Sequence, residues 1–336
     1  MFKCIPRVRK SFIDRVFFHP EKVMKNLMQV HKNRVNHLDR LRKEYGINKF
    51  RFLPKGTYKA TAERIGYHKN TISRIADEVR ILGLFPNLEK SKAVPLARIR
   101  TNRELRLFSQ KYDIYKLQCR EIYKLVKEWR IDLEKNPRDL LADIEYDLLI
   151  GSTIGDANVR QRNINCMFRV GHTVRQKKYV EWKQEILKHF NTQGIQLAQR
   201  IIRGRLINSY ELKINTHYVF NYFRRLFYDK EGIKHVTKEI LDQMNPRSLS
   251  IWLCDDGSYC RKQKYVIFCT NSYTLEEHQL IKKWFEEKYN LSPTIGFRDK
   301  KYYYLRFKKE DTAKLVEIVR PFIIPSMKYK IGEQNE

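Results

Sequence analysis

Two stretches of the sequence, 100 residues apart, carry the same succession of patterns, and this internal repeat restricts the possible folds more than any other feature. Each stretch opens with an apolar, helix-like segment that ends in acid, at Asp156 in the first and at Asp255 and Asp256 in the second. A basic, extended segment then leads to Phe168 or to Phe268. The order α-β-β-α-β-β-α is therefore predicted twice. The later paired segments are 176–190 with 275–289, 210–214 with 303–307, and 219–227 with 312–319.

Small residues mark one face of each acid-ending helix. Gly151 and Gly155 are four positions apart in the first helix, as are Ser250 and Cys254 in the second. Because residues four apart share a helix face, these small side chains predict that the two helices pack closely against each other. A helix pair of this kind would place both acidic ends at one location.

The two segments resemble the paired signature motifs of the LAGLIDADG homing endonucleases, in the single-chain form with two similar halves. Ile150-Gly-Ser-Thr-Ile-Gly-Asp-Ala157 resembles the variant ending in Gly-Asp-Gly or Gly-Asp-Ala, and Pro246–Ser258 resembles the variant ending in Asp-Asp-Gly. The tail Ile323–Ile331 is similar to the usual C-terminal close of the family. The resemblance covers roughly residues 144–331. It implies an α+β fold in which two pseudo-symmetric αββαββα repeats form a DNA-binding saddle.

The resemblance also implies a metal-dependent site where the motif helices end. Asp156 and Asp256 would be the catalytic, metal-binding carboxylates, because two adjacent carboxylates repel each other unless divalent cations lie between them. We expect Mg²⁺ or Mn²⁺, which would activate a water and stabilise the leaving oxygen. The Asp-Asp-Gly pattern favours Asp256, whereas aligning the helices on their small residues pairs Asp156 with Asp255, which therefore stays open as a metal ligand.

Two core lysines are implied as catalytic residues near the cut phosphates. The first matches Lys234, although the family's following Pro is Thr237 here, which weakens that match. The second matches Lys330, with Lys328 close enough to be confused with it.

The charge of the chain indicates a polyanionic partner. Its 68 Lys and Arg against 38 Asp and Glu give a net charge of +30. Residues 1–100 hold 24 basic and 8 acidic side chains and residues 151–250 hold 18 and 8, whereas residues 101–150 hold 10 of each. Two basic blocks separated by a neutral segment favour two nucleic-acid-binding modules joined by a connector. A merely solvated basic surface is the alternative.

Basic residues on the predicted strands are candidates for DNA contact, some to phosphates and others to base edges. In the first repeat these are Arg160, Arg162, Arg169, Arg200, Arg203, Arg205 and Lys213. In the second they are Arg261, Lys262, Lys264, Arg298, Lys300 and Arg306.

The first basic block contains a pattern that resembles a helix-turn-helix over about residues 58–83. A short helix ends at Gly66, and a second begins around residues 68–70 and is closed by Gly83. The outer face of the second helix would present DNA-contacting side chains to a major groove. These candidates are Lys69, Asn70, Thr71, Ser73 and Arg74. A plain helical hairpin is the alternative.

Helical periodicity also appears over residues 20–45 and as one run over 101–133, which Asn136-Pro137 ends. We therefore predict an all-α N-terminal domain with the helix-turn-helix, then a connector and the two repeats. The domain ranges are 1–100, 101–137, 138–232 and 233–336.

The leading functional prediction is a site-specific double-strand DNA endonuclease involved in intron mobility, acting on a double-stranded target as a monomer because both halves of the site lie on one chain. The alternatives are a non-catalytic DNA-binding regulator on this scaffold, or a maturase that binds intron RNA. Six scattered cysteines without a Cys-x-x-Cys pair argue against a zinc site and against a disulfide framework. With neither a signal peptide nor a membrane-spanning run in the sequence, we expect an intracellular, reducing compartment, cytoplasm, nucleoid or an organelle matrix, and no membrane partner.

Overall fold

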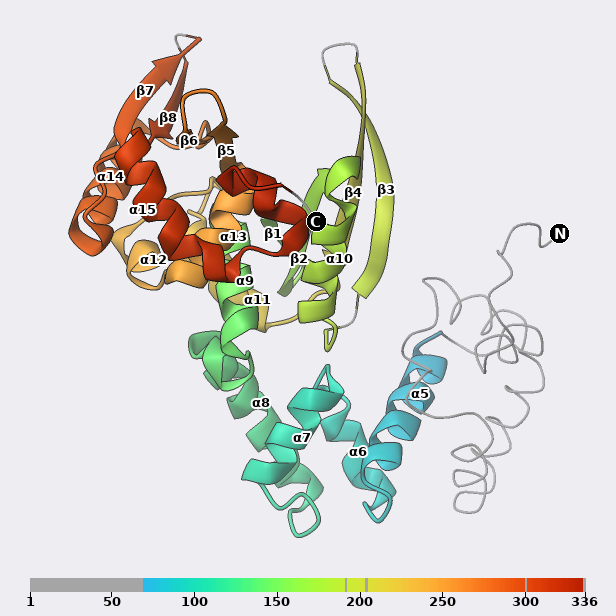
Figure 1. Cartoon of the computed structure of the whole chain (residues 1–336). Coiled ribbons are helices and arrows are strands. Elements are labelled where there is room, and N and C mark those ends of the chain that lie inside the picture. Colours follow the sequence, from blue (N-terminus) through green and yellow to red (C-terminus); the bar gives the residue numbers. More distant parts are fainter. Residues whose placement is uncertain (1–68, 191, 203–204, 300, 335–336) are drawn as a thin grey trace, which may run out of the picture. The chain divides into compact units, whose positions relative to one another are not determined.

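The computed structural model describes residues 69–190, 192–202, 205–299 and 301–334 (Figure 1). The chain divides into two compact units between Trp129 and Arg130, and each is described separately. The helix predicted over residues 20–45 and the first helix and turn of the predicted helix-turn-helix lie outside the described residues. The domain boundary near residue 137 stays a prediction.

The described part of the first unit is helical. Thr101 caps a helix by accepting from the Glu104 N–H at 3.1 Å, and the extended backbone of Tyr112 ends that helix. The predicted single run over 101–133 is therefore wrong: residues 112–118 separate two helices. Trp129 packs in this core and donates from Nε1 to the Glu104 carboxylate at 3.0 Å. The helices are α5 (Lys69–Leu84), α6 (Lys90–Leu96), α7 (Asn102–Lys111) and α8 (Cys119–Lys135), the last of which continues into the second unit.

The second unit contains the two repeats, and both follow the predicted order α-β-β-α-β-β-α. The first comprises α9 (Asp143–Ile154), β1 (Asn158–Arg162), β2 (Asn165–Thr173), α10 (Lys177–Ile186), β3 (Thr192–Ile202), β4 (Arg205–Ile214) and α11 (Val219–Phe227). The short helix α12 (Lys238–Asp242) follows. The second comprises α13 (Pro246–Asp256), β5 (Gly257–Cys260), β6 (Tyr265–Phe268), α14 (Leu275–Tyr289), β7 (Thr294–Arg298), β8 (Tyr302–Arg306) and α15 (Lys309–Val319).

Each repeat builds one antiparallel four-stranded sheet, in the orders β1-β2-β4-β3 and β5-β6-β8-β7. One face of each sheet is apolar and is covered by the helices of its own repeat (Figure 1). In the first sheet that face carries Phe168, Val170 and Leu212, all buried. Because strand side chains alternate between faces, the neighbouring residues Arg169 and Glu211 lie on the opposite face.

The motif helices α9 and α13 pack side by side, and glycine makes this contact possible. A Cβ on Gly151 would clash with the Ser248 carbonyl and lie 2.9 Å from Ile251 Cβ, and one on Gly155 would lie 2.7 Å from Asp255 Cβ. Both Gly151–Ile251 and Gly155–Asp255 pair residues 100 positions apart. Where two repeats are related by a pseudo-two-fold axis, a residue on that axis contacts the equivalent residue of the other repeat. These two contacts therefore indicate that the repeats superpose at an offset of 100.

Within the described residues, no helix is both long and apolar enough to span a membrane. The five cysteines in this part of the chain are all free thiols.

Candidate active site and nucleic-acid interface

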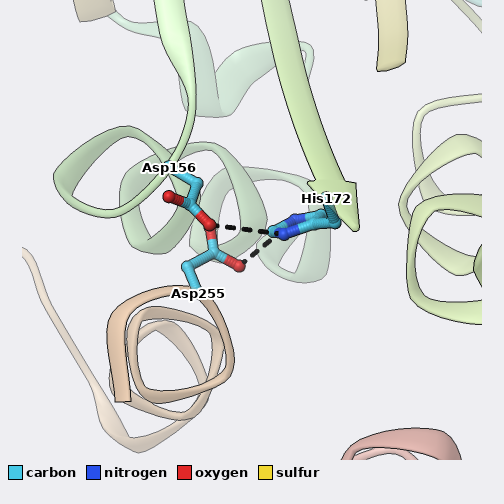
Figure 2. A group of neighbouring side chains, drawn as sticks. All are labelled: Asp156, His172 and Asp255. Atoms are coloured by element: carbon cyan, nitrogen blue, oxygen red, sulfur yellow. Dashed lines mark ion pairs between the residues drawn. The ribbon is translucent and has the colours of Figure 1, made fainter. Parts of the chain in front are cut away.

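The ends of α9 and α13 bring carboxylates together, as the motifs predict. Asp156 follows the last turn of α9, while Asp255 and Asp256 close α13. His172, near the end of β2, lies between two of them: its Nδ1 is 3.3 Å from Asp156 Oδ2 and its Nε2 is 3.6 Å from Asp255 Oδ1. Figure 2 shows the imidazole directed at both carboxylates. Atoms of Asp156, His172 and Asp255 lie within 4.8 Å of one another.

Asp255 is a buried carboxylate with a full set of partners. Its side chain and that of Lys183 are both inaccessible to solvent, and Lys183 Nζ lies 2.8 and 3.0 Å from the two carboxylate oxygens. Tyr179 Oη also donates to Asp255 at 2.8 Å, and Lys183 donates to Ser152 Oγ at 2.8 Å. A buried ion pair needs such additional hydrogen bonds to offset the cost of desolvation. The charge of Asp255 is therefore already balanced by helix α10 of the first repeat.

The other two carboxylates differ in exposure and in pKa. The Asp156 side chain is 42% exposed, and although burial alone would raise its pKa, the hydrogen bond and charge of His172 and the charges of Lys183 and Lys330 hold that pKa below its usual range. Asp256 accepts a hydrogen bond from Trp252 Nε1 at 3.0 Å. Burial, followed by the charges of Asp156 and Asp255, raises the pKa of Asp256 to about 8.

This donor set fits a divalent cation with a preference for oxygen ligands. Asp156, His172 and Asp255 offer ligand atoms close enough to share one ion, and Asp256 offers a further carboxylate, whose pKa is raised by burial and then by the charges of Asp156 and Asp255. Mg²⁺ is held in proteins by one or two carboxylates and retained waters. The buried Thr153 Oγ1 and His172 Nε2 also have no hydrogen-bond partner among the described residues.

A lysine lies at the end of each motif helix. Lys234 Nζ donates to the carbonyls of Thr153, Gly155 and Ala157 at 2.9, 2.7 and 3.1 Å. Lys330 Nζ donates to the Gly257 carbonyl at 2.6 Å. Residues 157 and 257 correspond at the offset of 100, so the two lysines occupy matching positions. Burial lowers the pKa of Lys234, and the charges of all three aspartates oppose this effect.

Sequence reasoning missed His172, Tyr179 and Lys183. One signal was present: the buried positions of α10 include Tyr179, Val180 and Lys183, so a lysine stands within the apolar stripe of that helix. A cation at such a position indicates a buried partner. His172 gave no comparable signal, because a histidine on a strand is compatible with many roles.

The predicted DNA-contacting residues fall into three groups: exposed side chains, side chains that contact other residues of the chain, and side chains that the structure does not describe. Arg160, Arg162 and the turn residues Arg261, Lys262 and Lys264 are exposed, as is Arg74 on α5. Arg298 donates to Asn271 Oδ1 at 3.3 Å, and the Arg306 guanidinium lies 4.1 Å from the centre of the Tyr265 ring. Arg169, Arg200 and Lys213 all contact Glu211. Outside the described residues or side chains are Lys69, Asn70, Thr71, Ser73, Arg203, Arg205 and Lys300.

Comparison with known families agrees with this geometry. The profile of the LAGLIDADG DNA endonuclease family matches residues 146–315, just over half of the chain, and the chain belongs to this family. It shares its fold with the homing endonuclease I-WcaI, solved bound to its DNA recognition sequence, with a TM-score of 0.53 and 22% identity over 65% of this chain and 96% of that one.

The similarity to curated proteins extends over a smaller share of this chain. "Protein RecA" of Mycolicibacterium fallax is 26% identical over 209 residues, which are 58% of this chain and 47% of that protein. Cytochrome b mRNA maturase bI2 of Saccharomyces cerevisiae is 28% identical over 216 residues, 60% of this chain and 50% of that protein. Intron-encoded endonuclease ai4 of Dictyostelium discoideum is 33% identical over 127 residues, 37% and 77% respectively. The chain thus spans about half the length of the first two.

Proposed function

We propose that this protein is a site-specific double-strand DNA endonuclease of the homing type, acting as a monomer with Mg²⁺ or Mn²⁺ held by Asp156 and Asp256. The observation that carries the proposal is the meeting of the two motif helices at their acidic ends, with a lysine at each end. Double-strand cleavage needs two reaction centres close together, and a fused pair of repeats provides both on one chain.

The roles of the three aspartates follow from their partners. Asp255 is neutralised by Lys183, so the carboxylates left to bind a cation are Asp156 and Asp256. The superposition at an offset of 100 supports the same pairing. A bound divalent ion would supply the Lewis acidity that activates a water and stabilises the leaving oxygen.

The cationic and imidazole groups would position the reacting phosphates. Lys234 and Lys330 lie at the two helix ends, where an ammonium group would stabilise charge that develops on a phosphate. His172, within reach of Asp156, would orient that carboxylate and a neighbouring water. The open faces of the two sheets would hold the duplex on either side.

We infer a supporting role for the N-terminal region, with the predicted helix-turn-helix adding affinity beside the main site. Linking two binding modules raises the effective concentration of the second without new contacts. The double variant Lys69→Ala/Arg74→Ala should weaken DNA binding and reduce its salt dependence, while cleavage at saturating protein is unchanged. Unchanged affinity would contradict this role.

A second function, binding of intron RNA as a maturase, is favoured by the relative named cytochrome b mRNA maturase bI2. It could coexist with cleavage. A regulator that binds DNA without cutting would have no need for the paired acids Asp156 and Asp256.

The decisive experiment is digestion of a randomised duplex DNA library with Mg²⁺, followed by sequencing of the cut ends. The wild type should cut one long site, and both Asp156→Asn and Asp256→Asn should abolish cutting while binding persists. Asp143→Asn is the matched control, because Asp143 lies in the first turn of α9 with its side chain 85% exposed. If the wild type binds DNA or intron RNA tightly but never cuts, the regulator or the maturase replaces this proposal.

A further inference from the structure

Four charged side chains form a cluster on the open face of the first sheet, away from the acid pair. Glu211 on β4 accepts from Nη2 of Arg169 on β2 and from Nη2 of Arg200 on β3, and Lys213 Nζ lies 3.4 Å from its other oxygen. Lys213 also donates to Gln196 Oε1 at 3.0 Å. The cluster thus connects three adjacent strands in the order β2-β4-β3.

Small residues let the long side chains lie across the sheet. Gly171 is directly opposite Glu211, and a Cβ there would lie 3.2 Å from Glu211 Cγ. Ala198 and Ser209 pair with each other beside this position, and Arg200 extends past them to reach the carboxylate. The strand register therefore groups small residues on this face of the sheet, and the long charged side chains lie over them.

Exposure within the cluster is graded. The Glu211 side chain is only 5% exposed, because the surrounding cations cover it. Arg169 and Lys213 are each 25% exposed, and Arg200 is 55% exposed. A carboxylate in this position has little direct access to a ligand, whereas each guanidinium has further N–H donors.

We propose that Glu211 is a positioning residue for DNA specificity, which holds Arg169, Arg200 and Lys213 so that they contact base edges in a major groove. The inference rests on the proposed DNA-binding function. An arginine reads guanine through two fixed hydrogen bonds to O6 and N7, which requires a defined orientation of the guanidinium. An unrestrained cation binds phosphates of any sequence equally well.

One carboxylate among three cations also leaves a net charge that favours DNA. Glu211 weakens the general attraction of this face for phosphate and, in return, orders the side chains that discriminate between bases. Non-specific affinity and sequence discrimination should therefore change in opposite directions when its charge is removed.

The test uses the full chain and two probes without divalent cation, the duplex recovered from the library and a scrambled duplex of the same length and composition. Glu211→Gln should bind the scrambled duplex several-fold more tightly, with a steeper salt dependence. Its preference for the target should fall about tenfold to a hundredfold, the range for loss of one or two base contacts. Glu185→Gln makes the same charge change on helix α10, where Glu185 is exposed, and should alter neither quantity.

A second variant guards against misfolding of the first. Arg200→Gln removes an exposed group and should relax the preference at one or two neighbouring base pairs of the target only. The inference is overturned if Glu211→Gln weakens binding to both duplexes in proportion, which is the result of a purely structural role, or tightens binding to both with discrimination unchanged. Absence of any DNA binding by the wild type would contradict the proposed function itself, and this inference with it.

Discussion

The two repeats have the same topology, but their motif helices end in different side chains. In the first, Gly155 precedes Asp156, and His172 approaches that aspartate. In the second, the position of Gly155 is taken by Asp255, and Asp256 is held by a tryptophan of its own helix. The second motif thus carries one more carboxylate than the first, at the point where the helices touch.

The difference shows that the repeats now depend on each other. An extra buried carboxylate is tolerated only because the first repeat supplies Lys183, Tyr179 and Ser152 around it. Two identical copies of the second repeat would carry two such acids facing each other at the axis. Fusion into one chain permits each half to specialise, because a substitution in one copy is not repeated in the other.

The largest effect should come from removing the cation that balances the extra acid. Lys183→Met keeps the volume but leaves the buried Asp255 without its ammonium partner, which should lower the free energy of unfolding by about 3–5 kcal/mol. Denaturant titration followed by circular dichroism measures this value.

A double variant separates charge from packing. Lys183→Met/Asp255→Ala removes both charges, and the free energy of unfolding should recover by about 2–3 kcal/mol relative to the single variant. Lys188→Met, in an exposed pair with Glu185, should leave stability unchanged. If the double variant is no more stable than Lys183→Met, the ion pair is not what balances the two repeats.

The next effect concerns the two helix-end lysines. Lys234 Nζ donates to the Gly155 carbonyl at the end of α9 and Lys330 Nζ donates to the Gly257 carbonyl at the end of α13, so each lysine lies beside a different motif helix. Lys234→Met and Lys330→Met should each slow cutting about a hundredfold. They should do so on opposite strands, which a substrate labelled separately on each strand would reveal as opposite nicked products. Equal slowing of both strands in either variant would contradict this pairing.

The sequence predicted the fold better than the site. Both copies of the order α-β-β-α-β-β-α were read correctly, because period-2 and period-3.6 patterns and the motif spacing are local features. The run over 101–133 was wrong, since a break at residues 112–118 depends on the backbone of Tyr112 and not on periodicity.

The surroundings of the acids could not be predicted, for a physical reason. Lys183 reaches Asp255 across 72 residues, and His172 on β2 reaches Asp156 at the end of α9, and neither contact follows from spacing along the chain. The cluster around Glu211 depends on strand register, which places Gly171 opposite it. Arg169 and Lys213 were selected as DNA-contacting residues from the sequence, but the acid that restrains them was not.

A smaller effect is expected from the histidine found in one repeat only. His172→Ala should slow cutting about tenfold on the strand served by Asp156 and leave the other strand unaffected, because Asp156 loses the partner that holds its pKa low. Strand-specific rates under single-turnover conditions give the comparison. Ser272, the exposed counterpart at the offset of 100, offers the control Ser272→Ala, which should show no strand bias. Equal slowing of both strands would mean that His172 acts on the whole site.

The smallest effect concerns the residues next to the two lysines in the sequence. His235, next to Lys234, contacts Asp229 at 2.8 Å and Glu277 at 3.4 Å, and the hydrogen bond to Asp229 together with the charge of Glu277 raises its pKa. Next to Lys330, the contact joins two uncharged side chains, since Gln176 donates to the Tyr329 hydroxyl at 2.8 Å.

The His235 contacts should therefore be fully present below the ordinary histidine pKa of about 6.5 and lost as pH rises through the raised value. The melting temperature of the wild type should fall slightly more than that of His235→Gln over this window, since a protonated histidine stabilises the folded state only while it keeps its charge. Asp229→Asn should remove most of the same dependence, and Gln176→Ala should leave it intact. A dependence that persists in both His235→Gln and Asp229→Asn would place its origin in other titratable groups.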